Sequence, residues 1–318
     1  MEVKKRPLII LAGPTASGKT DASIALAKAI GGEIISADSI QIYRYMDIGS
    51  AKITEEEKQG IPHYLIDTLY PDEEFNVVVF QKLAQEAMER IYEQGHIPIL
   101  TGGTGFYIQS VLYGIDFDET ETDLTYRSEL ETYAKEHGAE ALRNRLMSVD
   151  KKAAQAIHPN NIKRIIRALE YHRQTGGKIS EHNEEQRKKQ SPYQFAYFVL
   201  NRDRAALYER INLRVDQMLE RGLVDEVRHL LNLGYTRKLV SMQGLGYKET
   251  ASYLEGEMSY EELKETIKRD TRHFAKRQLT WFKREPEAEW IRMEDYPGQK
   301  QLTEALIARL AEKGILSE

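Results

Sequence analysis

Eight residues near the start of the chain have the types and spacing of a phosphate-binding loop. The segment 13–20 reads Gly-Pro-Thr-Ala-Ser-Gly-Lys-Thr and fits the pattern G-x-x-x-x-G-K-[ST]. The glycines allow several backbone N–H groups to point at one phosphate, Lys19 adds a positive charge, and the Thr20 hydroxyl can hold Mg²⁺. We therefore predict a diphosphate- or nucleotide-binding loop. Its predicted residues are Gly13, Pro14, Thr15, Ala16, Ser17, Gly18, Lys19 and Thr20.

The segments on either side of this loop favour the same interpretation. Apolar residues fill 8–12, as in a buried strand, and recur at helical spacing through 19–30. A chance glycine turn, the alternative, would need neither segment. The loop by itself does not say whether the bound phosphate is transferred, hydrolysed or released as a leaving group.

Two later segments follow predicted strands and are expected to face the same crevice. Asp38, after the strand 33–37, could hold Mg²⁺ through water, act as a base, or cap the next turn. Three glycines and Thr104 in 102–105, after the strand 97–101, could approach an anion or permit tight packing. Because ligands of parallel sheets bind beyond the carboxyl ends of the strands, we expect both segments beside the phosphate loop.

The order of predicted elements places this crevice on an α/β fold. Strand-like and helical segments alternate in the first third of the chain, which is typical of a parallel sheet with helices on both faces. The predicted strands are 8–12, 33–37, 63–67, 97–101, 194–200 and 289–292. The predicted helices of this core are 19–30, 76–94, 203–220, 222–233, 259–284 and 299–313.

A second part of the chain interrupts the alternation. Helical segments rich in Lys and Arg are predicted at 126–137, 139–147 and 150–174, followed by a polar stretch up to Gln190 without a predicted helix. We therefore predict two domains. A phosphate-loop core consists of 1–121 and 193–318, and a small helical domain of 122–192 is inserted into it.

Composition and charge limit the possible partners. The 318 residues include no cysteine, which excludes disulfides and cysteine zinc sites, and we expect a cytoplasmic protein. No apolar run approaches the roughly 20 residues that span a bilayer, so no membrane segment is expected. The net charge is −5, yet the segments 163–189 and 268–284 carry local charges of +4 and +6. Each basic segment is either a solvated helix face or a contact for nucleic acid.

Three classes of function remain open on these grounds. An ATP-dependent kinase for a small molecule or nucleotide would use the phosphate loop but leaves the basic segments unexplained. A transferase acting on nucleic acid, with diphosphate as its leaving group, would use both. A non-catalytic RNA-binding module would need no phosphate loop and is the least favoured.

Seven segments carry a resemblance to a known family. The most specific is 37–52, which reads Ala-Asp-Ser-Ile-Gln-Ile-Tyr-Arg-Tyr-Met-Asp-Ile-Gly-Ser-Ala-Lys. With 13–20, 62–67, 102–107, 157–161, 164–170 and 271–281, it closely resembles the bacterial tRNA dimethylallyltransferases of the IPP transferase family. These segments span nearly the whole chain. The small departures, Ser50, Tyr64 and Phe106, touch no proposed chemical role.

The resemblance implies a reaction. A dimethylallyl group would pass from dimethylallyl diphosphate to N6 of the adenosine on the 3′ side of the tRNA anticodon, with Mg²⁺ held at Thr20. Asp38 would accept the N6 proton as the C–N bond forms, because an adenine amino group is too weakly acidic to ionise beforehand. The implied catalytic residues are Asp38, Lys19, Thr20, Thr104 and Arg127.

We expect a monomer, and the resemblance implies that it binds the tRNA anticodon stem-loop. A flipped adenosine of a single-stranded loop would meet Ser39 to Gln41, and the basic segments would contact phosphates. For Gln243 and Tyr247 a turn at the start of a helix is an equally good interpretation. The implied tRNA-binding residues are Asp38, Ser39, Ile40, Gln41, Thr104, Arg127, Lys163, Arg164, Ile165, Ile166, Arg167, Met242, Gln243, Gly244, Leu245, Gly246, Tyr247, Lys276, Arg277 and Gln278.

Overall fold

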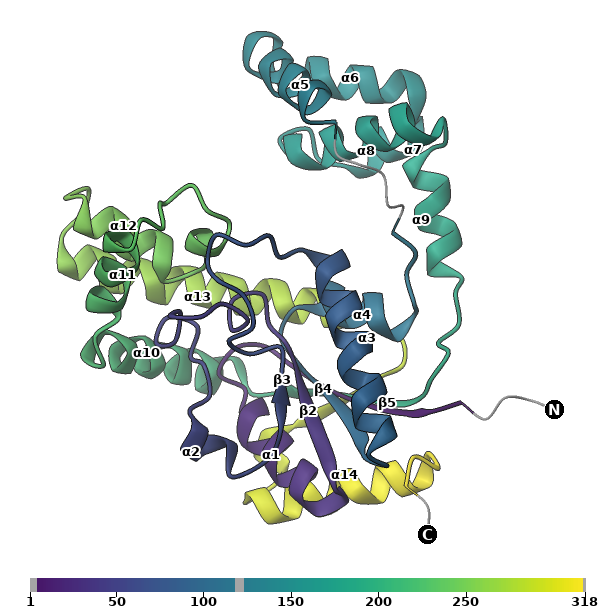
Figure 1. Ribbon diagram of the computed structural model, residues 1–318, viewed down its shortest axis with the longest axis vertical. Coiled ribbons are helices and arrows are strands. Elements are labelled where there is room, and N and C mark those ends of the chain that lie inside the picture. Colours follow the sequence, from purple (N-terminus) through teal and green to yellow (C-terminus); the bar gives the residue numbers. More distant parts are fainter. Residues whose placement is uncertain (1–4, 118–122, 317–318) are drawn as a thin grey trace. The chain divides into compact units, whose positions relative to one another are not determined.

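The computed structural model describes residues 5–117 and 123–316 (Figure 1). The chain separates into two compact units, one formed by Met1–Leu112 with Pro192–Glu318 and the other by Tyr113–Ser191. The domain boundary expected at 121/122 falls within 118–122, outside the described residues.

The first unit is built on a six-stranded sheet in the order β3-β2-β4-β1-β5-β6, and every described strand pair is parallel. The strands are β1 (Pro7–Ala12), β2 (Gly32–Ala37), β3 (His63–Tyr64), β4 (Ile97–Gly102), β5 (Gln194–Asn201) and β6 (Ala288–Arg292). The predicted α/β class is confirmed. The strand expected at 63–67 is shorter, because Leu65 and Asp67 adopt positive φ angles of 62° and 51°, which end it.

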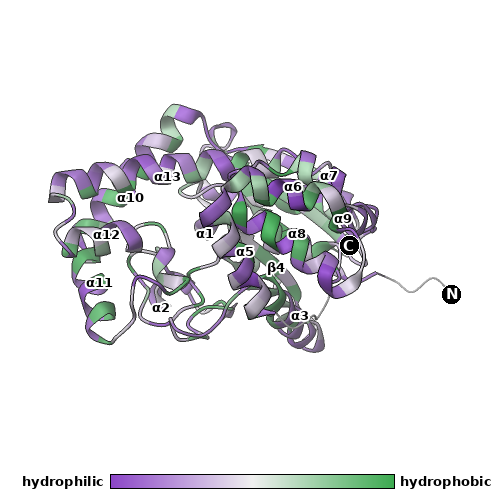
Figure 2. Ribbon diagram, turned by 90° about the horizontal axis from the view of Figure 1, so that it is seen from above, coloured by the Kyte–Doolittle hydropathy of each residue, from purple (hydrophilic) through white to green (hydrophobic). Residues whose placement is uncertain are grey.

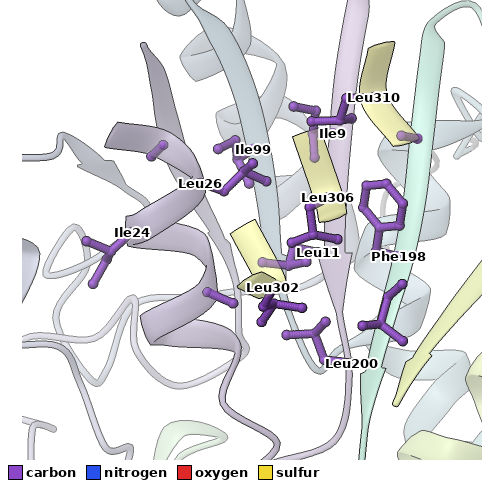
Figure 3. Close-up of a cluster of buried hydrophobic side chains, with 14 of the residues drawn as sticks. Ile9, Leu11, Ile24, Leu26, Ile99, Phe198, Leu200, Leu302, Leu306 and Leu310 are labelled. Carbon is purple, nitrogen blue, oxygen red and sulfur yellow. The ribbon is translucent and has the colours of Figure 1, made fainter. Parts of the chain in front are cut away.

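Helices cover both faces of this sheet, as predicted. On one face, α1 (Lys19–Ile30) and α14 (Gln299–Glu312) pack against β1 and β5. Figure 3 shows Leu302, Leu306 and Leu310 of α14 meeting side chains that alternate along those strands, including Ile9 and Phe198. The helices α3 (Val77–Glu93) and α4 (Gly105–Leu112) pack on the other face. This burial of alternate strand residues fixes the register, and with it the position of each strand end.

The remaining helices of the first unit lie after β2 or after β5. They are α2 (Glu55–Lys58), α10 (Arg204–Glu220), α11 (Leu223–Asn232), η1 (Ser241–Gln243), α12 (Tyr247–Leu254), α13 (Tyr260–Phe282) and η2 (Met293–Asp295). The helix α12 is not among the predicted core helices, although a helix beginning near Tyr247 is one of the two interpretations left open by the sequence. Its eight residues contain two tyrosines and two β-branched or small polar residues, so its helical period is hard to recognise from sequence.

The second unit is a small helical bundle with its own apolar core. Its helices are α5 (Leu124–His137), α6 (Ala139–Val149), α7 (Lys151–Ala156), α8 (Ile162–Thr175) and α9 (Ile179–Arg187). The helix predicted over 150–174 is divided in two, because Pro159 cannot continue a helix and Asn161 caps the next one through its side chain. Figure 2 shows hydrophobic and hydrophilic residues alternating along helices such as α6 and α8.

The polar stretch before Gln190, for which no helix was assigned, contains α9. Asp150 holds its start by accepting hydrogen bonds from the Ser180 N–H at 2.9 Å and hydroxyl at 2.7 Å. Tertiary contact therefore stabilises a helix that composition alone does not indicate. Within the described parts of the chain, no helix combines the length and apolar character needed to cross a bilayer.

Candidate active site at the carboxyl ends of the strands

The phosphate loop lies between β1 and α1, where the sequence predicts it. Gly18 has a φ of 103° directly before α1, a backbone conformation that favours glycine. A Cβ on Gly13 would lie 2.4 Å from the Leu200 carbonyl oxygen, so the loop packs against the end of β5 and only glycine fits. The first N–H groups of a helix lack partners within it, so the start of α1 can receive an anion.

Lys19 folds back into the loop. Its Nζ donates a hydrogen bond to the Pro14 carbonyl oxygen at 2.7 Å. Burial, together with the positive charge of Arg214, lowers the pKa of Lys19 to about 7, against an opposing effect of Asp38. A bound diphosphate would therefore favour the protonated, positively charged form of Lys19.

Three arginines that were not predicted as site residues donate hydrogen bonds to the phosphate loop. Arg202 donates to the Ser17 carbonyl at 3.2 Å, Arg210 to the Ala16 carbonyl at 3.0 Å, and Arg214 to the Thr15 hydroxyl at 3.2 Å. Arg202 follows β5, and Arg210 and Arg214 are four residues apart on one helix face. For Arg202 the available signal was its position directly after β5, the same rule that identifies Asp38, whereas Arg210 and Arg214 lie within α10 and carry no such signal.

The glycine segment after β4 lies against the phosphate loop, and Gln278 of α13 joins the two. The Thr15 N–H donates to Gln278 Oε1 at 2.9 Å, and Gln278 Nε2 donates to the Gly103 carbonyl at 3.0 Å. A Cβ on Gly103 would lie 2.0 Å from Gln278 Nε2. Tight packing, the alternative left open for these glycines, is therefore one of their functions. Gln278 itself is buried, so it positions loops and does not present its amide to an RNA surface.

Thr104 and Gly105 form the start of α4 beside the same segment. The Thr104 N–H donates to the Ala37 carbonyl at 3.3 Å, which ties it to the end of β2. A Cβ on Gly105 would lie 2.0 Å from the Trp281 ring, and Phe106 meets that ring edge-on at 6.0 Å. Thr104 is half-buried and lies one residue from this aromatic contact.

Asp38 caps the turn that follows it and faces the cations of the loop. Its Oδ1 accepts hydrogen bonds from the Ile40 N–H at 2.8 Å and the Gln41 N–H at 3.3 Å. Its charge also opposes the lowering of the pKa of both Lys19 and Arg214. The capping alternative therefore applies, and Asp38 directly follows the end of β2, as expected.

Gln41 has a different environment from the one expected of a base-reading side chain. Its Oε1 accepts from the Ser36 hydroxyl at 3.0 Å, and its Nε2 donates to the Ser50 and Ala51 carbonyls at 3.3 Å each. Both amide hydrogens are engaged within the loop. Ser39 and Ile40 are half-exposed.

The predicted tRNA-binding residues divide by exposure. Lys163, Arg164, Gln243, Lys276 and Arg277 are exposed, and Arg167, Gly244 and Leu245 are half-buried. Ile165 and Ile166 are buried in the apolar core of the second unit, and the side chains of Met242 and Tyr247 are buried in the first, so in this structure they present no atoms to RNA. Tyr247 is the first residue of α12, which agrees with the alternative of a turn at the start of a helix. Gly246, also buried, precedes it.

Lys276 and Arg277 lie on the exposed face of α13, opposite Gln278. A hollow of about 440 Å³ follows this face and is lined by His273, Lys276, Arg277, Thr280, Trp281 and Arg284. Cationic and aromatic side chains occur together on it, which suits contacts with phosphates and bases.

Arg127 belongs to the second unit, in the first turn of α5. Its Nε and Nη2 donate to the two carboxylate oxygens of Glu170, each at 2.8 Å. Glu170 is buried, so this bidentate pair fixes the plane of the guanidinium.

A divalent cation would find few protein ligands here. Among the described residues, no group of three or more His, Cys, Asp or Glu side chains could hold a metal. Thr20 offers an exposed hydroxyl in the first turn of α1, beside the phosphate loop. Mg²⁺ commonly takes one or two protein ligands together with substrate phosphates, so this arrangement fits Mg²⁺ carried by a diphosphate.

Sequence comparisons agree on one family. Residues 41–285 match the IPP transferase family. A protein of Lachnoclostridium phytofermentans named tRNA dimethylallyltransferase is 60% identical over 98% of this chain and 99% of its own length. Another of that name from Alkaliphilus oremlandii is 50% identical over 95% and 96%.

Solved structures give the same result. A tRNA isopentenylpyrophosphate transferase from Bacillus halodurans has a TM-score of 0.73 and 44% identity, covering 98% of both chains. A eukaryotic dimethylallyltransferase acting on tRNA has a TM-score of 0.84 and 29% identity, covering 98% of this chain and 79% of the other.

The lowered pKa of Lys19 predicts proton uptake when an alkyl diphosphate binds. A bound diphosphate favours the charged amine and raises its pKa, so at pH 8 binding takes up nearly one proton, and affinity falls as the pH rises above about 7. The diphosphate itself is then ionised, because phosphate groups lose their last proton near pH 6. Calorimetry in buffers of different ionisation enthalpy measures this uptake.

Lys19→Arg is the matched control, since a guanidinium stays charged throughout this range. It should bind the diphosphate without proton uptake at pH 8. Equal uptake by the two proteins would contradict the assignment to Lys19.

Proposed function

The chain belongs to the IPP transferase family, and from this membership we infer that it is a tRNA dimethylallyltransferase. We propose that it transfers the dimethylallyl group of dimethylallyl diphosphate to N6 of the adenosine on the 3′ side of the anticodon. The observation that supports the proposal is that Asp38 directly follows Ala37 of β2, whose carbonyl accepts from the Thr104 N–H at 3.3 Å, beside the glycine segment that Gln278 joins to the phosphate loop. The kinase alternative is not favoured, because relatives at 50–60% identity are named tRNA dimethylallyltransferases.

The cations beside the phosphate loop suit a diphosphate leaving group. The allylic C–O bond breaks with its electron pair going to the diphosphate oxygen, and the N6–C bond forms. Lys19, Arg214 and the start of α1 would stabilise the growing negative charge, because these groups are already held in place by the loop. The Thr20 hydroxyl would hold Mg²⁺ with the diphosphate oxygens, and that ion would add positive charge at the leaving group.

Asp38 would accept the N6 proton while the new bond forms. Its Oδ1 is fixed by the Ile40 and Gln41 N–H groups, which holds the carboxylate at one place in the crevice. A carboxylate oriented by its own turn is a suitable general base for a proton that becomes acidic only in the transition state.

The tRNA would contact both units. On the first unit, the exposed face of α13 supplies Lys276 and Arg277 beside the Trp281 ring. On the second unit, Lys163 and Arg164 are exposed at the start of α8. These groups suit the phosphates and unpaired bases of an anticodon stem-loop. By resemblance, Thr104 and Arg127 would reach the reacting groups, and the enzyme would act as a monomer in the cytoplasm.

The direct test is the product. Incubation of the protein with unmodified tRNA, Mg²⁺ and dimethylallyl diphosphate should give N6-dimethylallyl adenosine, detected by mass spectrometry of the digested tRNA. Diphosphate release should need both substrates, and tRNA affinity should fall steeply with salt. ATP turnover with a small acceptor and without tRNA would instead favour the kinase.

Asp38→Asn should lower the single-turnover rate by about 100-fold or more while tRNA affinity changes little. The amide oxygen of asparagine keeps the hydrogen bonds to Ile40 and Gln41, so the turn is preserved and only the base is removed. Filter binding and quenched-flow rates measure the two effects. A parallel loss of affinity and rate would contradict the role of Asp38 as a base.

Thr20→Val should raise the Mg²⁺ concentration needed for half-maximal rate by about tenfold, because valine keeps the shape and lacks the hydroxyl. Thr20→Ser keeps the hydroxyl and serves as the control. Full activity of the wild-type protein in excess EDTA would reject the Mg²⁺ proposal.

A further inference from the structure

Glu226, in the first turn of α11, occupies an unusual place for a charged side chain. Its carboxylate accepts three consecutive backbone N–H groups of another segment: Asp47 at 3.0 Å and Ile48 at 2.7 Å on Oε2, and Gly49 at 3.1 Å on Oε1. The Tyr247 hydroxyl donates to Oε1 at 2.8 Å. One carboxylate therefore joins α11, α12 and the loop that continues from Asp38.

Close packing between Tyr247 and Gly49 accompanies these hydrogen bonds. The ring of Tyr247 lies directly on Gly49, where a Cβ would come within 2.6 Å of two ring atoms. Burial, with the charge and hydrogen bond of Glu226, raises the pKa of Tyr247 well above its usual value, so its hydroxyl remains a donor to the carboxylate. A Cβ on Gly244 would come within 3.0 Å of Ile40, so the segment before α12 also touches the turn that Asp38 caps.

A continuous set of hydrogen bonds leads from Glu226 to Asp38. The turn 47–51 closes through the Ala51 N–H on the Ile48 carbonyl at 3.0 Å. Its Ser50 and Ala51 carbonyls hold the Gln41 amide, and the Gln41 N–H donates to Asp38 Oδ1. Each hydrogen bond of this set shares a residue with the next one.

We propose that Glu226 is a positioning residue for Asp38: by holding the turn 47–51 through Asp47, Ile48 and Gly49, it sets the crevice loop from which Asp38 reaches the substrate. This inference rests on the proposed function of Asp38 as a base. It assigns to α11 and α12 the task of keeping that base in place, with Tyr247 as the partner that orients the carboxylate.

Glu226→Gln is the main test. The glutamine amide would present N–H groups to the Gly49 N–H, so part of the contact is lost while the size is kept. We expect the single-turnover rate at saturating substrates to fall about 10- to 100-fold, with unchanged tRNA affinity and a folded protein by thermal melting. Hydrogen exchange should become faster at 38–41 as well as at 47–51.

Two further measurements separate positioning from general stability. In the Asp38→Asn background, Glu226→Gln should lower the rate little further, because its effect acts through Asp38, whereas a separate structural effect would multiply. Tyr247→Phe keeps the ring on Gly49 and removes only the hydroxyl, so it should give a smaller fall of the same kind. If Glu226→Gln does not fold, the rate of Tyr247→Phe tests the positioning role instead.

Glu220→Gln, at an exposed position at the end of α10, is the matched control and should behave as wild type. A wild-type protein that makes no N6-dimethylallyl adenosine would overturn the proposed function. An active wild type with a Glu226→Gln rate equal to that of Glu220→Gln, or with faster exchange at 47–51 alone, would overturn the positioning role. So would fully multiplicative effects with Asp38→Asn, or, where Glu226→Gln does not fold, an unchanged rate in Tyr247→Phe.

Discussion

The spacing between the two glycine loops depends on one amide. Gln278 accepts from the Thr15 N–H and donates to the Gly103 carbonyl, so it fixes the distance between the loops that follow β1 and β4. Gly103 must lack a Cβ for this approach, and Gly105 must lack one for the neighbouring Trp281 ring. A helix late in the chain, α13, thereby sets the geometry of a site whose recognisable motifs lie near its beginning. Each buried amide hydrogen bond contributes only about 1 kcal/mol, so precision of placement is the main effect of this clamp.

The positive charges of the site are held before any substrate arrives. Arg202 and Arg210 donate to carbonyls of the phosphate loop, and Arg214 donates to the Thr15 hydroxyl. Burial lowers the pKa of Lys19 and of Arg214. Charges fixed in such surroundings interact with a developing diphosphate more strongly than they would in water, and they need little rearrangement during the reaction.

The loop that carries Asp38 is fixed from two sides. On one side, the buried Lys52 amine donates to the Tyr43 carbonyl at 2.7 Å and to the Asp47 and Asp67 carboxylates at 2.6 Å each. From the other side, Glu226 holds the N–H groups of the same turn. The polar groups of this segment, which has no regular secondary structure, thus find partners in their own loop and in α11. A base on such a loop keeps its position although no strand or helix contains it.

The sequence by itself determined the parallel α/β core, the glycine loop between β1 and α1 and the position of Asp38 after β2, because these follow from local patterns: alternation of apolar residues and a glycine spacing. It also carried the resemblance that the comparisons confirm. The tertiary structure decided what local patterns do not encode. In the tertiary structure Gln278 joins two loops, and the side chain of Gln41 bonds within its own loop. Ile165, Ile166, Met242 and Tyr247 are buried, and the helix predicted over 150–174 is divided around Pro159. Arg214 contacts the phosphate loop, and Glu226 contacts the turn 47–51. These outcomes depend on contacts between segments as far apart as Thr15 and Gln278, and only the packed chain brings such partners together.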